Sequence, residues 1–83
     1  MEFTDTVKMM NSSDYKERYK AEYFQLKIRY EKLSAMLDKY KNGKPDFTPT
    51  CSYELLFEQL IYMENYMHML EERAMIENVD IEE

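Results

Sequence analysis

Glycine and proline are nearly missing from this chain of 83 residues, which contains one glycine and two prolines. Both residues punctuate turns and interrupt helices, so their scarcity beside abundant Glu, Lys, Leu and Met predicts an all-α fold. Cysteine is limited to Cys51, which excludes a disulfide within one chain. A lone thiol favours a reducing, cytoplasmic setting.

Long apolar runs are missing too. No stretch approaches the ~18 uninterrupted apolar residues of a membrane span. Residues 1–11 lack the basic start and apolar run of a signal peptide. We therefore expect a soluble protein with no membrane partner.

Residues that perform catalysis are sparse. The chain has no glycine-rich phosphate loop, no cysteine pair and one histidine, so no nucleophile and base can be paired. His68 lies near Glu64, Glu71 and Glu72, but Glu-x-x-x-His occurs once, whereas di-metal bundles use Glu-x-x-His on paired helices. We interpret His68 as solvated and Cys51 as a half-buried apolar residue. We predict no enzymatic activity, no metal and no cofactor.

Helical periodicity is what the chain has in abundance, most clearly between Thr50 and Glu77. Apolar residues recur there at alternating steps of three and four, as on one helix face: Tyr53, Leu56, Leu60, Met63, Met67, Leu70 and Ala74. A second apolar run lies beside it: Leu55, Tyr62, Tyr66, Met69 and Ile76. Together they are wider than the stripe on a surface helix of a small monomer. This helix is either central to a bundle or shared between subunits.

An earlier segment has the same periodicity. Its seam steps by four and three through Tyr19, Tyr23, Leu26, Tyr30, Leu33, Leu37 and Tyr40. Asp14 is a candidate N-cap for this helix, and Thr50 or Ser52 for the next. We predict a single domain with an N-terminal arm or short helix (1–11), helix one (14–41), a connecting loop (42–50), helix two (51–77) and a loose acidic tail (78–83).

Two long helices of matched length predict an antiparallel hairpin. Residues 1–49 carry a net charge of +2 and residues 50–83 a net charge of −8, so the halves attract each other, or the acidic half attracts a basic partner. One hairpin closes only one seam, which predicts a homo-oligomeric helical bundle. We expect its interface to use the surplus apolar faces, at Phe24, Ile28, Leu55, Phe57, Ile61 and Met69.

Tyrosine is unusually frequent, with eight residues, most of them on or near an apolar seam. The rings either pack inside with their hydroxyls at the edges, or line a pocket that stacks a base or anchors a partner. For a small nucleotide we predict stacking by Tyr19, Tyr23, Tyr62 and Tyr66, and phosphate contacts by Lys16 or Lys20. The scattered lysines form no basic stripe, which disfavours a nucleic-acid polymer.

The segments YKAEYFQLKIRYEKL and ELLFEQLIYMENYMHMLEERAMIE resemble small helical-hairpin proteins of bacteriophages and prophages. The resemblance implies an accessory phage protein of the host cytoplasm, in a class that includes inhibitors of host defence proteins and oligomeric sponges for nucleotide immune signals. We therefore predict a non-enzymatic protein that blocks or sequesters a host-defence component. The alternative is a structural or assembly module of a phage particle that acts only through self-association.

Overall fold

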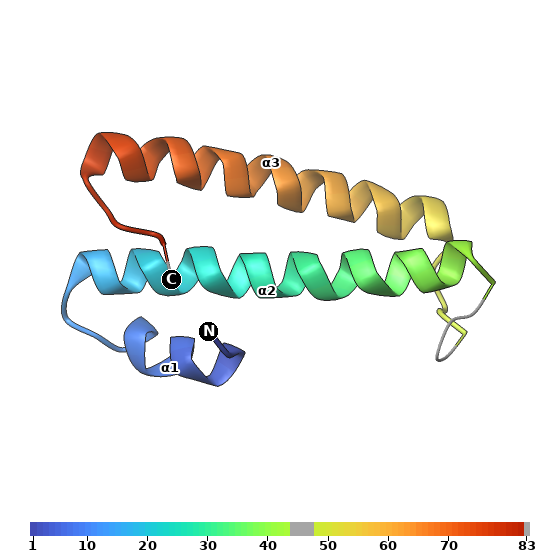
Figure 1. The fold of residues 1–83 in the computed structure, drawn as a ribbon, viewed down its shortest axis with the longest axis horizontal. Coiled ribbons are helices and arrows are strands. Elements are labelled where there is room, and N and C mark those ends of the chain that lie inside the picture. The colour runs from blue at the N-terminus through green and yellow to red at the C-terminus, as the bar shows by residue number, and fades with distance from the viewer. Residues whose placement is uncertain (44–47, 83) are drawn as a thin grey trace.

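The computed structural model describes residues 1–43 and 48–82, and this part of the chain contains three helices and no strand. They are α1 (Phe3–Met10), α2 (Tyr15–Lys41) and α3 (Tyr53–Glu77). Figure 1 shows α2 and α3 side by side and running in opposite directions, with α1 against the first half of α2. The all-helical prediction is confirmed for the described residues. The middle of the predicted loop 42–50, residues 44–47, lies outside them.

Local capping explains where the helices begin and end. The Asp14 carboxylate accepts a hydrogen bond from the Lys16 backbone N–H (2.9 Å), and the Ser52 hydroxyl accepts one from the Leu55 N–H (3.2 Å). Each bond satisfies an amide that has no partner within its own helix. At the other end of α3, Asn78 takes a left-handed conformation with φ of 57°. This turns the chain back toward α2.

The two predicted seams meet between α2 and α3. All fourteen seam positions are buried or half-buried, from Tyr19 to Tyr40 on α2 and from Tyr53 to Ala74 on α3. A buried cluster lies at the end where α2 begins and α3 ends, and consists of Tyr19, Tyr23, Phe24, Leu70, Ala74 and Val79. The periodicity therefore predicted the packed faces of both long helices correctly.

Phe24 and Ile28 were expected at an oligomer interface, and the structure corrects this expectation for Phe24. Phe24 is only 1% exposed within the single chain, and Ile28 is half-buried. α1 packs on this part of α2: Gln25 donates a hydrogen bond to the hydroxyl of the fully buried Thr6 (2.9 Å), and the Arg29 guanidinium lies 5.3 Å from the centre of the Phe3 ring. The second apolar face of α2 is thus largely covered by the chain itself.

The predicted loose tail is a second correction. Val79 is only 7% exposed and belongs to the buried cluster, and the partly buried Ile81 packs against the same cluster. A backbone hydrogen bond from the Val79 N–H to the Ala74 carbonyl (2.9 Å) fixes the reversal. Apolar residues alternate with acids in the tail sequence VDIE, and this alternation was the signal for packing. Among the described residues, no helix is both long enough and apolar enough to cross a membrane.

Candidate functional site

The outer side of α3 is strongly apolar and has no covering element in the described part of the chain. We define the α3 stripe as Leu55, Tyr62, Tyr66, Met69 and Ile76, which are all exposed by 45% to 76%. This is the second apolar run of the sequence. Contiguous apolar surface of this kind marks an interaction site on a soluble protein. The folded chain therefore leaves the surplus face of α3 available to a partner.

A shallow groove of about 470 Å³ lies in the first half of this stripe. It is lined by Leu55, Glu58, Gln59, Tyr62, Met63 and Tyr66. The Tyr62 hydroxyl donates to a Glu58 carboxylate oxygen (3.3 Å), and the Tyr66 hydroxyl donates to Glu22 of α2. These bonds hold the phenol ends of both rings. An open apolar hollow with a few polar groups at its edge has the general form of a ligand or partner site.

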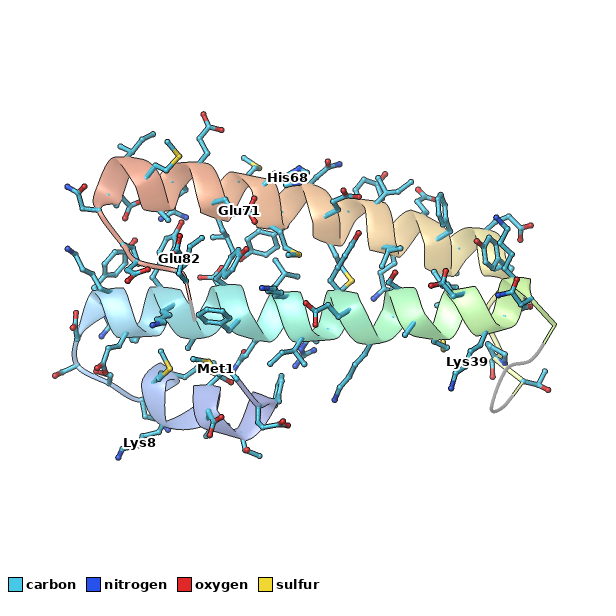
Figure 2. All side chains as sticks on the ribbon, viewed as in Figure 1. Met1, Lys8, Lys39, His68, Glu71 and Glu82 are labelled. Atoms are coloured by element: carbon cyan, nitrogen blue, oxygen red, sulfur yellow. The ribbon has the colours of Figure 1, made fainter. Side chains whose placement is uncertain are left out.

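Tyr62 and Tyr66, two of the four tyrosines predicted to stack a ligand, are thus in the groove. The other two, Tyr19 and Tyr23, belong to the core instead. The Tyr19 hydroxyl donates to the Leu70 carbonyl (2.6 Å) and the Tyr23 hydroxyl to the Glu71 carboxylate (2.6 Å). Figure 2 shows Glu71 pointing from α3 toward α2. The four tyrosines therefore do not form one aromatic pocket in this conformation.

Burial of the two core tyrosines alters their acidity. Removal from solvent raises the pKa of Tyr19 above its ordinary value. Removal from solvent, with a further contribution from the hydrogen bond to Glu71, raises the pKa of Tyr23 to about 12. The charged phenolate is disfavoured in both places because a buried anion loses its hydration, and at Tyr23 it would also face the Glu71 carboxylate.

Lys16 and Lys20, predicted to contact phosphate, lie on the first part of α2. Lys16 is exposed, and the Lys20 ammonium lies 5.8 Å from the centre of the Phe24 ring. The neighbouring Tyr15 pairs with Glu77, eleven positions beyond Tyr66 on α3, which corresponds to about 16 Å along a helix. The two lysines are thus placed toward the opposite end of α3 from the groove.

A polar cluster that the sequence analysis did not single out joins the start of α2 to the end of α3. Arg73 donates from Nε to Glu77 (3.0 Å) and from Nη2 to the Tyr15 hydroxyl (3.1 Å), which itself donates to Glu77 (2.8 Å). The guanidinium also lies 5.1 Å from the centre of the Tyr19 ring. The i, i+4 spacing of Arg73 and Glu77 was the available signal.

These contacts also change the acidity of the cluster. The hydrogen bond from Tyr15, helped by Arg73, holds the pKa of the Glu77 carboxyl below its usual value. The hydrogen bond to Glu77 raises the pKa of Tyr15. The carboxylate is thus stabilised in its ionised form, and the phenol in its neutral form.

The remaining predicted residues lie on the surface of α3. Phe57 and Ile61 are exposed by 44% and 43%, and Met69 is in the α3 stripe. His68 is also exposed (Figure 2). Within residues 1–43 and 48–82, no group of three or more His, Cys, Asp or Glu side chains is arranged to hold a metal ion. Cys51 was expected to be half-buried but is an exposed free thiol.

The fold and the face of α3 together define a small all-helical protein with an open groove on one long helix. The chain belongs to the Sequestin family, whose model matches residues 13–76. The matched segment includes all of α2 and almost all of α3, whereas α1 precedes it. The family name is compatible with a protein that binds and sequesters a partner. Searches of curated proteins and of solved structures found no match.

Proposed function

We propose that this chain is a non-enzymatic protein of phage type that binds and sequesters a component of host defence in the host cytoplasm. The component is either a defence protein or a nucleotide immune signal. One observation carries the proposal: the groove between Leu55 and Tyr66 is an apolar hollow on a face that no described part of the chain covers. Membership of the Sequestin family supports it.

The groove suits a ligand that presents a flat or apolar surface. Tyr62 and Tyr66 offer ring faces, and aromatic stacking on a nucleobase is sequence-tolerant because every base has a π face. Met63 adds a flexible, polarisable side chain that adapts to different shapes. A partner protein would use the same surface by inserting apolar side chains, as at ordinary protein interfaces.

Binding and sequestration can be tested by native mass spectrometry of protein purified gently from a bacterial host. A signal of nucleotide size, or a co-purified protein, bound to the wild-type chain and lost from Tyr62→Ala would support the proposal. Met75→Ala is the matched control, since Met75 is 81% exposed on α3 but is not among the groove residues. It should keep the bound species.

The same two variants should be compared in cells. Expression of the wild-type chain should restore phage growth on a bacterium that carries a matching defence system, and Tyr62→Ala should lose this effect while Met75→Ala keeps it. Failure of the wild-type chain to bind any species or to alter defence in a panel of such hosts would contradict the proposal.

The second candidate is a structural or assembly module that acts only through self-association. The α3 stripe favours it, because an exposed apolar run along a helix is also what a bundle interface requires. In that case purified protein would be a clean multimer without a bound species. Tyr62→Ala would then weaken the multimer and have no separate effect on binding.

A further inference from the structure

We infer that the α3 stripe pairs with the same stripe of a second copy, antiparallel, about a two-fold axis between Asn65 and Tyr66. The inference deepens the proposed function, because the second copy would complete the groove. The part that treats the groove as the binding site rests on the proposed function. The pairing itself follows from three properties of α3: the spacing of its exposed apolar residues, their symmetry and the placement of its charges.

Spacing is the first property. Leu55, Tyr62, Met69 and Ile76 are each seven residues apart and are the four stripe members with the greatest exposure, between 56% and 76%. A seven-residue apolar repeat is the pattern that keeps two helices in contact along their length. It runs for twenty-one positions of a helix whose other apolar face is already packed on α2, which is roughly 32 Å. A single short ligand does not account for a repeat of that length.

Symmetry is the second property. In an antiparallel pair centred between Asn65 and Tyr66, Leu55 faces Ile76 of the second copy, and Tyr62 faces the second copy's Met69. Every contact is made twice, as a two-fold interface requires. Tyrosine on methionine is a favourable contact between a ring and a thioether. Each of the four exposed apolar side chains thus meets another apolar side chain.

Charge placement is the third property. Arg73 is the only basic residue of α3, which also carries six glutamates. The antiparallel register places Glu58 and Gln59 in one layer with Glu72 and Arg73 of the second copy, so the cation meets an acid twice. A parallel pair would instead place Arg73 against Arg73 and Glu58 against Glu58. Since like charges in contact are destabilising, the charges select the antiparallel arrangement.

The pairing changes the groove. None of its six lining residues carries a positive charge, and Glu58 is an acid. The second copy would bring Arg73 to the edge of the groove. Arg73 binds Glu77 and Tyr15 in its own chain, but its side chain is 51% exposed and its charge still acts on the neighbouring surface. Met69 and Ile76 of the second copy would form its roof. The binding site is therefore shared between two chains, and each dimer has two such sites.

The association is tested on purified protein without added ligand, by analytical ultracentrifugation over a hundredfold concentration range. We expect a dimer for the wild type and at least a tenfold weaker dimer for Met69→Glu, since Met69 is not among the six residues that line the groove of the single chain. Met75→Glu, on another side of α3, is the matched control and should remain as dimeric as the wild type. Circular dichroism of each variant establishes that the helices are retained.

Disulfide cross-linking tests the register in a Cys51→Ser background. Asn65→Cys should form a cross-linked dimer under mild oxidation, since it lies next to its own copy at the axis. Leu55→Cys should not, because it faces Ile76. A monomeric wild type, a dimer that Met69→Glu leaves intact, or a Leu55→Cys dimer that forms as readily as the Asn65→Cys dimer would each overturn the inference. None of these outcomes bears on whether a ligand binds, so failure of the pairing is distinguishable from failure of the proposed function.

Discussion

At the scale of single residues, the tyrosines divide into two groups that the sequence alone did not separate. Tyr19 and Tyr23 share a seam with leucines, and that seam predicted their burial, but whether their hydroxyls would meet protein or ligand was left open. The structure supplies the partners, the Leu70 carbonyl and Glu71. Both partners lie about fifty positions away in sequence, and local periodicity cannot identify contacts at that separation.

Tyr23 should make the fold sensitive to alkali. Its pKa is about 12 in the folded chain, against about 10 for an unfolded tyrosine. The folded state therefore favours the neutral phenol, and this stabilisation is complete below pH 10 and is lost as the pH rises from 10 to 12. Between pH 10 and pH 12 the melting temperature of Tyr23→Phe should fall less than that of the wild type, and the remaining fall comes from Tyr15 and Tyr19, whose pKa values are also raised. The substitution should cost about 1 kcal/mol at neutral pH through the lost hydrogen bond.

Thermal melts from pH 7 to pH 12 followed by circular dichroism measure this effect. Tyr62→Phe, which removes a hydroxyl from the exposed groove, is the control for loss of a tyrosine hydroxyl outside the core. If Tyr23→Phe and the wild type lost stability in parallel above pH 10, the Tyr23 hydroxyl would not be the titrating group.

Glu77 should make the fold less stable in acid, whereas Tyr23 makes it less stable in alkali. The Tyr15 hydrogen bond and Arg73 lower the pKa of Glu77 in the folded chain. The ionised carboxylate therefore stabilises the fold at pH values above the unfolded pKa of about 4.3, and this stabilisation is lost as the pH falls through the folded pKa. Glu77→Gln should melt at a lower temperature than the wild type at pH 7, with a gap that closes below pH 4. A gap that stayed constant down to pH 3 would argue against the carboxylate as its cause.

At the scale of the elements, the long helices were predictable because the spacing of apolar residues within each helix indicates which of its faces is buried. The cap at Asp14 was predicted, and the alternatives Thr50 and Ser52 are resolved in favour of Ser52. The attachment of α1 was not predictable, since it depends on Thr6, a polar residue that is fully buried and receives a hydrogen bond from Gln25. Phe24, which the sequence had placed at an interface, is buried in the cluster that includes Leu70 of α3 and Val79 of the tail.

Ser52→Ala should destabilise the start of α3. The serine hydroxyl is the partner of the Leu55 N–H, and loss of an N-cap of this kind costs about 1 kcal/mol. Chemical denaturation should show the difference as a lower midpoint with an unchanged slope. Cys51→Ala, one position earlier and exposed, is the control, and an equal loss there would mean that the cap is not responsible.

The tail should behave as part of the core. Val79→Asp would bury a carboxylate in the cluster around Phe24 and Leu70, and we expect a loss of about 2 kcal/mol or more because the charge would have no partner there. The measurement is the denaturation midpoint. Asp80→Asn, at the next and exposed position, should have little effect, whereas equal stability of Val79→Asp and the wild type would mean that the tail is not packed in solution.

At the scale of the whole molecule, the sequence correctly predicted an all-helical chain whose α3 has more apolar surface than α2 can cover. It offered a tyrosine-lined pocket as one alternative but did not predict which tyrosines would share it, because the hollow between Leu55 and Tyr66 depends on side-chain orientations rather than on spacing. The groove and the α3 stripe share Leu55, Tyr62 and Tyr66, so the proposed sequestration and the inferred self-association would use the same three residues.

The linkage has a thermodynamic consequence. If two copies pair through α3, the melting temperature should rise with protein concentration, because association stabilises only the folded chain. Melts over a hundredfold concentration range would show this for the wild type and for Met75→Glu. Met69→Glu should lose the dependence, and a wild-type melting temperature that is constant over the range would contradict dimerisation.

The two ends of the molecule differ in how many elements pack together. α1 and the C-terminal tail both pack near the start of α2, around Phe24 (Figure 1). That end has several layers, while the end near Lys41 and Tyr53 has only two helices in contact, with Tyr40 and Tyr53 rings 5.7 Å apart. Local opening follows the density of buried contacts. Amide hydrogen exchange should therefore form a gradient, slowest near Tyr23 and Leu70 and fastest toward the helix ends beside the connecting loop. The groove lies in the half of α3 where we expect faster exchange, so the backbone there should be able to adjust to a partner without disturbing the cluster around Leu70.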